Sequence, residues 1–173
     1  MRQLIVILIS LALLGTLVPK AVAQSDDAQE KLFQVKAAFV FNFLNFSELP
    51  NKDADITVCT FSNEVAQKAF SALESKRAKE RKIVVRHLSS DDSAENCDIA
   101  YIDFENEANT SPNKAAFEKT LTIGESRAFC DNGGIIGFFE DSGKLRFRIN
   151  LKHARSKGIT FSSKLLKLAE VIR

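Results

Sequence analysis

The stretch GGIIGFFEDSGKLRFRIN, residues 133–150, can be interpreted either as a phosphate loop or as turns and strands. Phosphate loops need the spacing G-x-x-x-x-G-K-[ST] or G-x-G-x-x-G, and neither spacing occurs here. The glycines fit turns instead, because Gly and Asn tolerate positive φ. Asp141-Ser142-Gly143 predicts a turn between an apolar run and an alternating run. The stretch therefore predicts an antiparallel β-hairpin.

The second strand of this hairpin alternates with a period of two. Leu145, Phe147 and Ile149 share one face, and the other face carries Lys144, Arg146, Arg148 and Asn150. Same-face neighbours on a strand lie about 6.6 Å apart, and two guanidinium groups at that spacing suit a carboxylate, a phosphate or an acidic partner surface. The alternative is a charged strand face that stays in solvent and protects a sheet edge. Arg146, Arg148 and Asn150 are thus a candidate anion site.

Upstream of the hairpin, short apolar runs alternate with helical patterns. Strands are predicted at 56–61, 83–85, 98–104 and 121–123, helices at 64–73 and from Ser111 to Phe117, and a solvated loop within 74–82. A short helix at 151–157 and a last helix from Ser162 to Val171 follow the hairpin. This order predicts an α/β fold in a single domain, with a mixed, mostly parallel sheet, helices on both of its faces and a C-terminal antiparallel hairpin.

The segment from Lys31 to Leu49 predicts a helix with a wide apolar surface. One stripe is formed by Leu32, Val35, Phe39, Phe43 and Phe46, and a second by Phe33, Ala37, Val40 and Leu44, with Phe41 beside it. Together they cover about 240° of the helix, which is more than a helix lying on a protein surface needs. Either this helix is nearly buried or it also contacts another chain. Phe39, Phe41 and Phe43 are the candidate partner-binding residues.

Residues 1–23 have the pattern of a secretory signal peptide. Arg2 precedes an apolar run from Leu4 to Leu17, and Ala21-Val22-Ala23 is an A-x-A cleavage site. A membrane anchor is the alternative, but a span needs about 20 apolar residues, and the run is interrupted by Pro19 and Lys20. We therefore predict a cleaved signal peptide at 1–23, a flexible segment at 24–30 and a folded domain at 31–173.

Charge and aromatic composition limit the class of partner. The chain has 24 basic and 22 acidic residues, and loss of Arg2 and Lys20 with the signal peptide would leave the two counts equal. A neutral protein is a poor candidate for nucleic-acid binding, which normally requires a basic excess. The chain has 14 Phe and no Trp, and Phe suits dry cores and apolar contact surfaces because it needs no hydrogen-bond partner.

Three cysteines follow the signal peptide, namely Cys59, Cys97 and Cys130. In an exported chain, an odd count permits one disulfide and one remaining thiol. Metal binding is the alternative, but there is no C-x-x-C motif and both histidines are far from the cysteines in sequence. A catalytic pair of Cys130 and His153 has no supporting motif, and G-x-S-x-G is absent. The sequence predicts no catalytic residue, no metal site and no cofactor.

Several segments of the chain resemble one known family. They are QVKAAFVFNFLNFSELP (34–50), ITVCTF (56–61), NCDIAYI (96–102), LTIGES (121–126), GGIIGFF (133–139) and KLRFRINLKHARSKGITFSSKLLKLAEV (144–171). In this order they are similar to the YfiR family over nearly all of the chain after residue 23. The last segment is the most specific, because a chance match of that length is implausible.

The resemblance implies a periplasmic protein of a Gram-negative bacterium that is not an enzyme and is usually a homodimer. It implies inhibition of a membrane-bound diguanylate cyclase through the periplasmic sensor domain of that cyclase. An OmpA-like outer-membrane lipoprotein would relieve the inhibition, so that cyclic di-GMP and biofilm formation rise. The alternative function is an envelope module that binds a small anionic ligand at Arg146 and Arg148 and acts on a sensor protein. A hydrolase that uses Cys130 ranks last.

The resemblance also implies a structural disulfide between Cys59 and Cys97. Cys130 matches a second cysteine position of the family, but the position of its partner falls within GGIIGFF, which has no cysteine. The chain departs here from the two-disulfide pattern, so a second, redox-tuning bridge is not expected.

Overall fold

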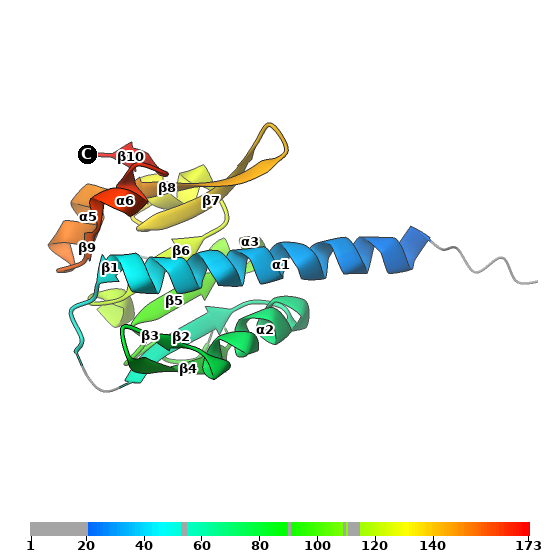
Figure 1. The fold of residues 1–173 in the computed structure, drawn as a ribbon, viewed down its shortest axis with the longest axis horizontal. Helices are drawn as coiled ribbons and strands as arrows, with labels where there is room; N and C mark the ends of the chain where they lie inside the picture. The colour runs from blue at the N-terminus through cyan, green and yellow to red at the C-terminus, as the bar shows by residue number, and fades with distance from the viewer. Residues whose placement is uncertain (1–20, 53–54, 90, 109, 111–114) are drawn as a thin grey trace, which may run out of the picture.

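The computed structural model describes residues 21–52, 55–89, 91–108, 110 and 115–173 (Figure 1). Most of the predicted signal peptide lies outside these residues, and its cleavage stays a prediction. Helix α1 (Ala21–Phe46) includes residues 24–30, for which the sequence predicts a flexible segment. No Gly or Pro interrupts the helix there, and the Glu30 carboxylate lies 3.0 Å from Lys68 Nζ on the neighbouring helix.

In the described part of the chain, an eight-stranded sheet has the order β10-β8-β7-β6-β5-β2-β4-β3. The strands are β2 (Asp55–Phe61), β3 (Arg77–Ala78), β4 (Arg81–Leu88), β5 (Ile99–Ile102), β6 (Leu121–Gly124), β7 (Ile136–Asp141), β8 (Lys144–Asn150) and β10 (Glu170–Ile172). Antiparallel pairing occurs between β7 and β8 and between β3 and β4, and the other neighbours are parallel. The mixed, mostly parallel sheet and the C-terminal hairpin are confirmed. Two further strands, β1 (Ser47–Glu48) and β9 (Thr160–Phe161), pair with each other.

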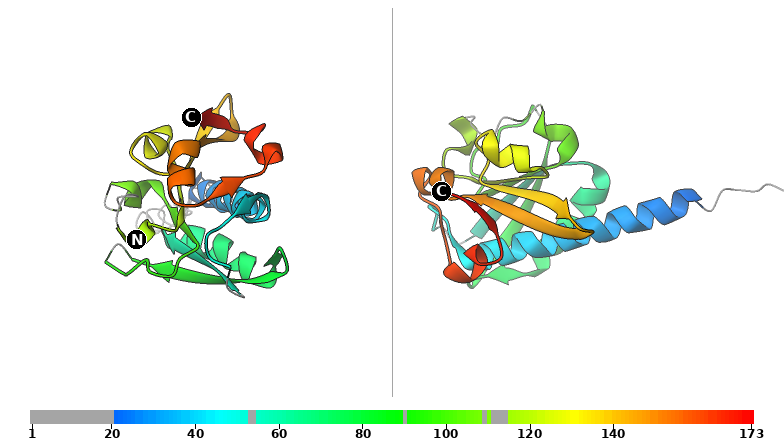
Figure 2. Two further views of the ribbon diagram at one scale, coloured as in Figure 1. Left: turned by 90° about the vertical axis from the view of Figure 1, so that its left-hand side faces the viewer. Right: turned by 90° about the horizontal axis from the view of Figure 1, so that it is seen from above.

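Helices cover both faces of the sheet, as predicted (Figure 2). Besides α1 they are α2 (Glu64–Ser71), η1 (Ala72–Ser75), α3 (Phe104–Glu107), η2 (Ala115–Phe117), α4 (Arg127–Asp131), α5 (Leu151–Ser156) and α6 (Ser163–Leu166). The central strand β2 shows why both faces are dry, since its residues alternate between two buried clusters. Ile56 and Val58 pack in the cluster that contains α1, and Phe61 packs in the other with Phe117 and Phe129. None of the described helices is long and apolar enough to span a bilayer.

Several predicted elements differ in detail. The last predicted helix ends at Leu166, and residues 170–172 form the strand β10 beside β8. The predicted strand 98–104 ends at Ile102, because the Asp103 side chain caps α3. The predicted loop within 74–82 contains the β3–β4 turn, in which Lys79 and Glu80 have φ values of 50° and 65°. The predicted helix at Ser111 lies outside the described residues until η2 begins.

The order of the parallel strands creates a topological switch point between β2 and β5. The chain runs from β2 to β4 on one side of β2 and returns to β5 on its other side. In open α/β sheets, ligands bind in the crevice outside the carboxyl ends of the strands at such a point. A functional site is therefore expected at the carboxyl ends of β2, β5 and β6.

Candidate functional site

Asp103 follows β5 at the switch point, and its side chain forms its hydrogen bonds within the domain. Its side chain is buried and accepts hydrogen bonds from the backbone N–H of Asn63, at 2.9 Å, and from Asn106, at 3.0 Å. It also accepts from the side-chain amide of Asn106 at 2.8 Å. These bonds hold the first turns of α2 and α3 together, so the Asp103 carboxylate is a structural group.

Glu125 follows β6 and is the centre of a second polar cluster. Its carboxylate forms an ion pair with Lys36 of α1 and accepts a hydrogen bond from the hydroxyl of Tyr101. The side chains of Lys36 and Glu125 are only 7% and 14% exposed. Burial, reinforced by the Glu125 charge, raises the pKa of Tyr101 well above its usual value. The Tyr101 hydroxyl therefore stays protonated and acts as a donor to Glu125.

Glu107 of α3 closes this cluster from the other side. It accepts a hydrogen bond from the backbone N–H of Glu125 and one from the Ser126 hydroxyl at 2.8 Å. Burial raises the pKa of Glu107, although both bonds oppose the shift. The groups of this cluster satisfy one another, and they tie α1 to the sheet near the strand ends where related topologies hold a ligand. Within the described residues, no group of His, Cys, Asp or Glu is arranged to hold a metal ion.

The candidate anion site does not form as a single open site. The Arg148 guanidinium contacts Asp131 Oδ1 at 3.1 Å and donates to Glu170 Oε1 at 2.6 Å. The Asn150 side chain caps α5 by accepting from the backbone N–H of His153 at 3.0 Å, and it donates to the carbonyl of Cys130. Of the three candidate residues, Arg146 alone is exposed, and it forms no ion pair with another described residue. Arg148 and Asn150 therefore hold β10, α4 and α5 to the hairpin.

The first helix also differs from the prediction at one of its three candidate residues. Phe43 is completely buried, and its ring lies 5.0 Å from that of Phe147 and 5.8 Å from that of Phe138. Phe39 and Phe41 are half-buried. Phe43 is therefore a core residue, because it points between the helix and the hairpin. It cannot contact a partner while the domain is folded.

The outward apolar surface of α1 lies on neighbouring positions of the helix. Leu32, Val35 and Phe46 are 42%, 46% and 38% exposed, and the half-buried Phe39 lies between them. We call these four residues the α1 stripe. They are the first apolar stripe of the sequence without Phe43. Successive residues of a helix are rotated by about 100°, and this rotation places Phe43 closer to the buried face than the other four residues of the predicted stripe. The sequence pattern did not distinguish Phe43 from them.

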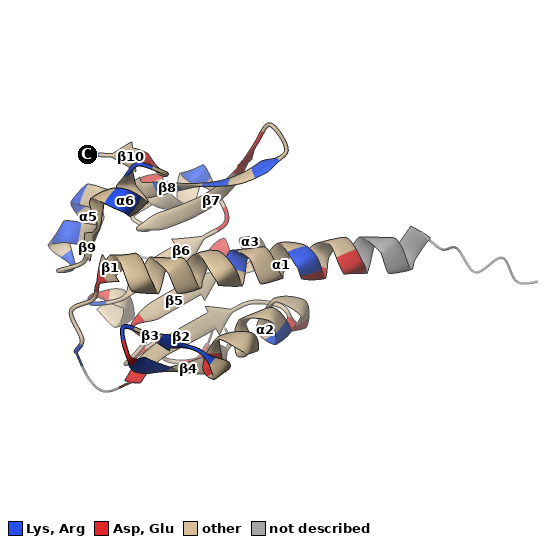
Figure 3. Ribbon diagram, in the orientation of Figure 1, with Lys and Arg blue, Asp and Glu red and all other residues tan. Residues whose placement is uncertain are grey.

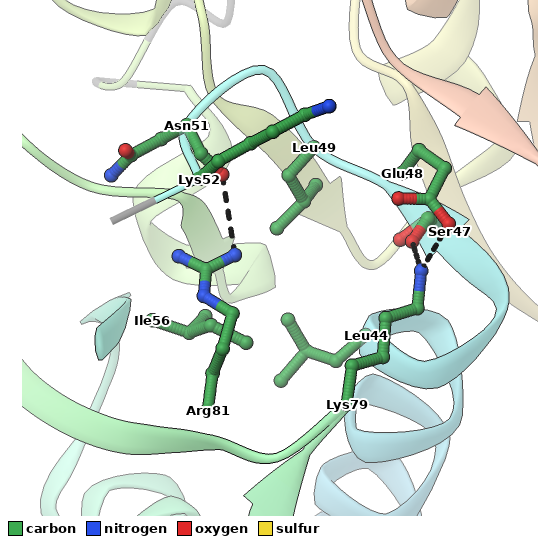
Figure 4. A pocket seen from close by; sticks show the side chains of 9 residues that line it. All are labelled: Leu44, Ser47, Glu48, Leu49, Asn51, Lys52, Ile56, Lys79 and Arg81. Atoms are coloured by element: carbon green, nitrogen blue, oxygen red, sulfur yellow. Dashed lines mark hydrogen bonds and ion pairs between the residues drawn. The ribbon is translucent and has the colours of Figure 1, made fainter. Parts of the chain in front are cut away.

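A cleft of about 240 Å³ lies between the C-terminal end of α1 and the β3–β4 turn (Figure 4). Its walls carry the cations Lys52, Lys79 and Arg81. Lys79 donates to the carbonyl of Ser47 and to the Glu48 carboxylate, both at 2.6 Å. The two terminal nitrogens of Arg81 donate to backbone carbonyls of residues 51 and 55. Lys79 and Arg81 thereby fasten the segment after α1 to the β3–β4 turn, in which Lys79 and Glu80 have left-handed backbone conformations.

Cys59 and Cys97 form a disulfide, with a Cα–Cα distance of 5.8 Å. Cys130 is a free thiol and is completely buried. Burial raises the pKa of Cys130 to about 12, so the thiolate needed for nucleophilic chemistry does not form at neutral pH. Among the described residues, no hydrogen bond joins Cys130 to the His153 ring.

We expect the variant Cys59→Ser/Cys97→Ser to lose about 3–4 kcal/mol of unfolding free energy, because the bridge closes a loop with a sequence separation of 38. Urea denaturation followed by circular dichroism measures this loss. A reducing agent should lower the midpoint of the wild-type protein and leave that of the double variant unchanged. An unchanged wild-type midpoint after verified reduction would contradict the expected stabilisation.

Comparison with known proteins identifies a family and a similar solved structure. The sequence matches the profile of the YfiR/HmsC-like family over residues 33–170. A search of curated proteins finds no match. The crystal structure of a conserved domain protein from Vibrio cholerae O1 biovar El Tor superimposes with a TM-score of 0.54 at 15% sequence identity. The alignment covers 82% of this chain and 60% of that chain, and this likeness shows the fold alone. Since the profile covers well over half of the sequence, the chain belongs to the YfiR/HmsC-like family.

Proposed function

We propose that the protein is a periplasmic, non-enzymatic regulator that represses a membrane-bound diguanylate cyclase by contact with its periplasmic sensor domain. The family match supports a periplasmic regulator over a catalyst. An OmpA-like outer-membrane lipoprotein would relieve the repression, which would raise cyclic di-GMP and biofilm formation. The protein would act as a homodimer.

The observation that carries the proposal is the α1 stripe. Leu32, Val35 and Phe46 are exposed, and the half-buried Phe39 between them packs against the main core. Exposed apolar surface that adjoins a core typically marks a contact with another protein. The polar groups at the switch point are used within the fold, so the stripe is the more promising functional surface.

Repression requires no chemistry in this mechanism. A regulator that binds the inactive state of a sensor domain more tightly than the active state shifts the equilibrium by that difference in affinity. Release by the lipoprotein needs only competition for the regulator. Both steps use protein surface and neither uses a catalytic group.

The alternative function, an envelope module for a small anionic ligand, has less support. Arg148 is paired with Asp131 and Glu170, and Asn150 is a helix cap. Arg146 alone offers one guanidinium group, whereas the alternative requires two guanidinium groups side by side on the strand.

Deletion of the gene should raise cyclic di-GMP in the native host, and the wild-type gene should restore the low level. We expect Leu32→Ser/Phe46→Ser to restore it poorly, because the variant places hydroxyls on the contact surface. Gln34→Ser is the matched control, since Gln34 is exposed on the same helix but outside the stripe. Cyclic di-GMP is measured by mass spectrometry, with export and folding checked by periplasmic extraction and thermal melts.

Two outcomes would count against the proposal. Unchanged cyclic di-GMP after deletion, in a host that carries a linked cyclase, would remove the proposed function. Full repression by Leu32→Ser/Phe46→Ser would keep the function but place the contact elsewhere.

A further inference from the structure

The spacing of the α1 stripe is that of a helix–helix seam. Leu32, Val35, Phe39, Asn42 and Phe46 follow one another at alternating steps of three and four, the a/d spacing of packed helices. At 3.6 residues per turn they lie within an arc of about 80° and extend over about 21 Å along the axis. From Ala37 to Phe46, α1 carries no charged residue (Figure 3).

Two hollows lie along the seam on the side of the hairpin and α6. One of about 220 Å³ is bounded by Leu32 and Lys36 of α1, by Glu125 and by residues of the β7–β8 hairpin. The other, of about 160 Å³, lies between Phe39 and Phe46 of α1 and Leu165 and Leu168 near α6. The hairpin and α6 lie along the same side of α1 (Figure 1). We call the surface formed by the α1 stripe and these two hollows the groove.

The middle of the groove is apolar. The Phe39 ring lies 5.8 Å from the ring of Phe138 and 5.8 Å from that of Phe147, so it fills the space between the two hollows. Leu168, 66% exposed, extends the apolar surface at the far end. A ligand that fits this shape presents apolar groups along one narrow face over several helical turns.

The end of the groove near α6 is basic. Lys164 lines the second hollow, and Lys167 follows one residue after α6. Both side chains are exposed, and neither has a carboxylate partner in the described ranges. Blue on α6 marks this end in Figure 3. Carboxylates, or the negative end of a helix dipole, would be stabilised here.

We propose that this groove binds one amphipathic helix of the partner protein, lying along the α1 stripe with carboxylates or its C-terminal end beside Lys164 and Lys167. The inference rests on the proposed function and specifies the partner element that the regulator recognises. Asn42 lies within the seam, where a single polar residue fixes the register of two helices. The bound helix therefore presents a polar group opposite Asn42.

Photo-cross-linking in the native host tests the geometry. Leu32 and Phe46 are each replaced by p-benzoylphenylalanine, and Gln34→p-benzoylphenylalanine is the off-stripe control. We expect both stripe positions to cross-link to one membrane protein, within one segment whose apolar residues recur at steps of three and four. The sites reached from Leu32 and Phe46 should be separated by about 14 residues, since the two helices run side by side at the same rise per residue.

A charge test uses the cross-linked segment synthesised as a peptide. Lys164→Glu/Lys167→Glu should weaken its binding to the mature protein by roughly tenfold at low salt and less at high salt, because the attraction is screened. Lys152→Glu/Lys157→Glu is unsuitable as a control because Lys157 donates to the carbonyl of Phe117. Lys152→Glu, at an exposed position of α5, should leave the affinity unchanged.

Failure of this inference is distinguishable from failure of the proposed function. Cross-links to a second copy of this chain, to a strand or loop of a partner, or to nothing would overturn the helix site. Repression of cyclic di-GMP by the wild-type gene would stand in each of those cases. Loss of that repression in the deletion experiment would instead remove the function on which the inference rests.

Discussion

Lys36→Met should lower the free energy of unfolding by about 3–5 kcal/mol, because removal of one partner leaves the other charge buried and unpaired. Lys36 is the ammonium partner of Glu125, and both side chains are shielded from solvent. Chemical denaturation at neutral pH measures the change. This loss of unfolding free energy should be among the largest for substitution of any single charged residue in the helices of the protein.

The double variant Lys36→Met/Glu125→Gln separates charge from packing. The neutral amide oxygen of Gln can still accept from the Tyr101 hydroxyl, so most of the lost stability should return. Lys68→Met is the control on the neighbouring helix, because its pair with Glu30 is exposed and exposed pairs contribute less than about 1 kcal/mol. An equal loss for Lys36→Met and Lys68→Met would mean that Glu125 is hydrated rather than buried.

Phe43→Ala should cost about 3–5 kcal/mol, since it removes a fully buried ring and leaves a cavity. Phe46→Ala, three residues later on the same helix, should cost clearly less, because 38% of its surface is exposed. Thermal and urea denaturation of the two variants give the comparison.

The same pair of variants separates core from contact surface. Phe46→Ala should weaken repression of cyclic di-GMP while the protein stays folded. Phe43→Ala should affect repression only through the amount of folded protein. Similar stabilities for the two variants would contradict the assignment of Phe43 to the core.

The sequence predicts the sheet well because its signals are local. Turn residues with positive φ and strict alternation give the hairpin at 136–150, and the alternation of strands and helices gives the α/β class. The sequence does not predict the strand β10, because Glu170–Ile172 forms a strand only through its pairing with β8. A short apolar segment after a helix start carries no local sign of that pairing.

For the functional surfaces too, the sequence predicts the local pattern but not the contacts between distant segments. Alternation correctly separates Arg148 from Phe147, but the partners of Arg148 come from α4 and β10, which are distant in sequence. The cluster around Glu125 joins it to Lys36 and Tyr101, at sequence separations of 89 and 24. No sequence motif predicts these contacts, because the residues are far apart in sequence and the topology of the sheet brings them together. The helical stripe was visible in the sequence, whereas the burial of Phe43 depends on where the hairpin packs.

The order of the cysteines along the chain has a consequence for biogenesis. The paired residues Cys59 and Cys97 both precede the unpaired Cys130. In a chain exported N-terminus first, they are the first two thiols to reach an oxidising compartment. Oxidation in order of emergence therefore yields the native bond directly. We therefore expect formation of this disulfide in an exported chain to depend on a thiol oxidase more than on a disulfide isomerase.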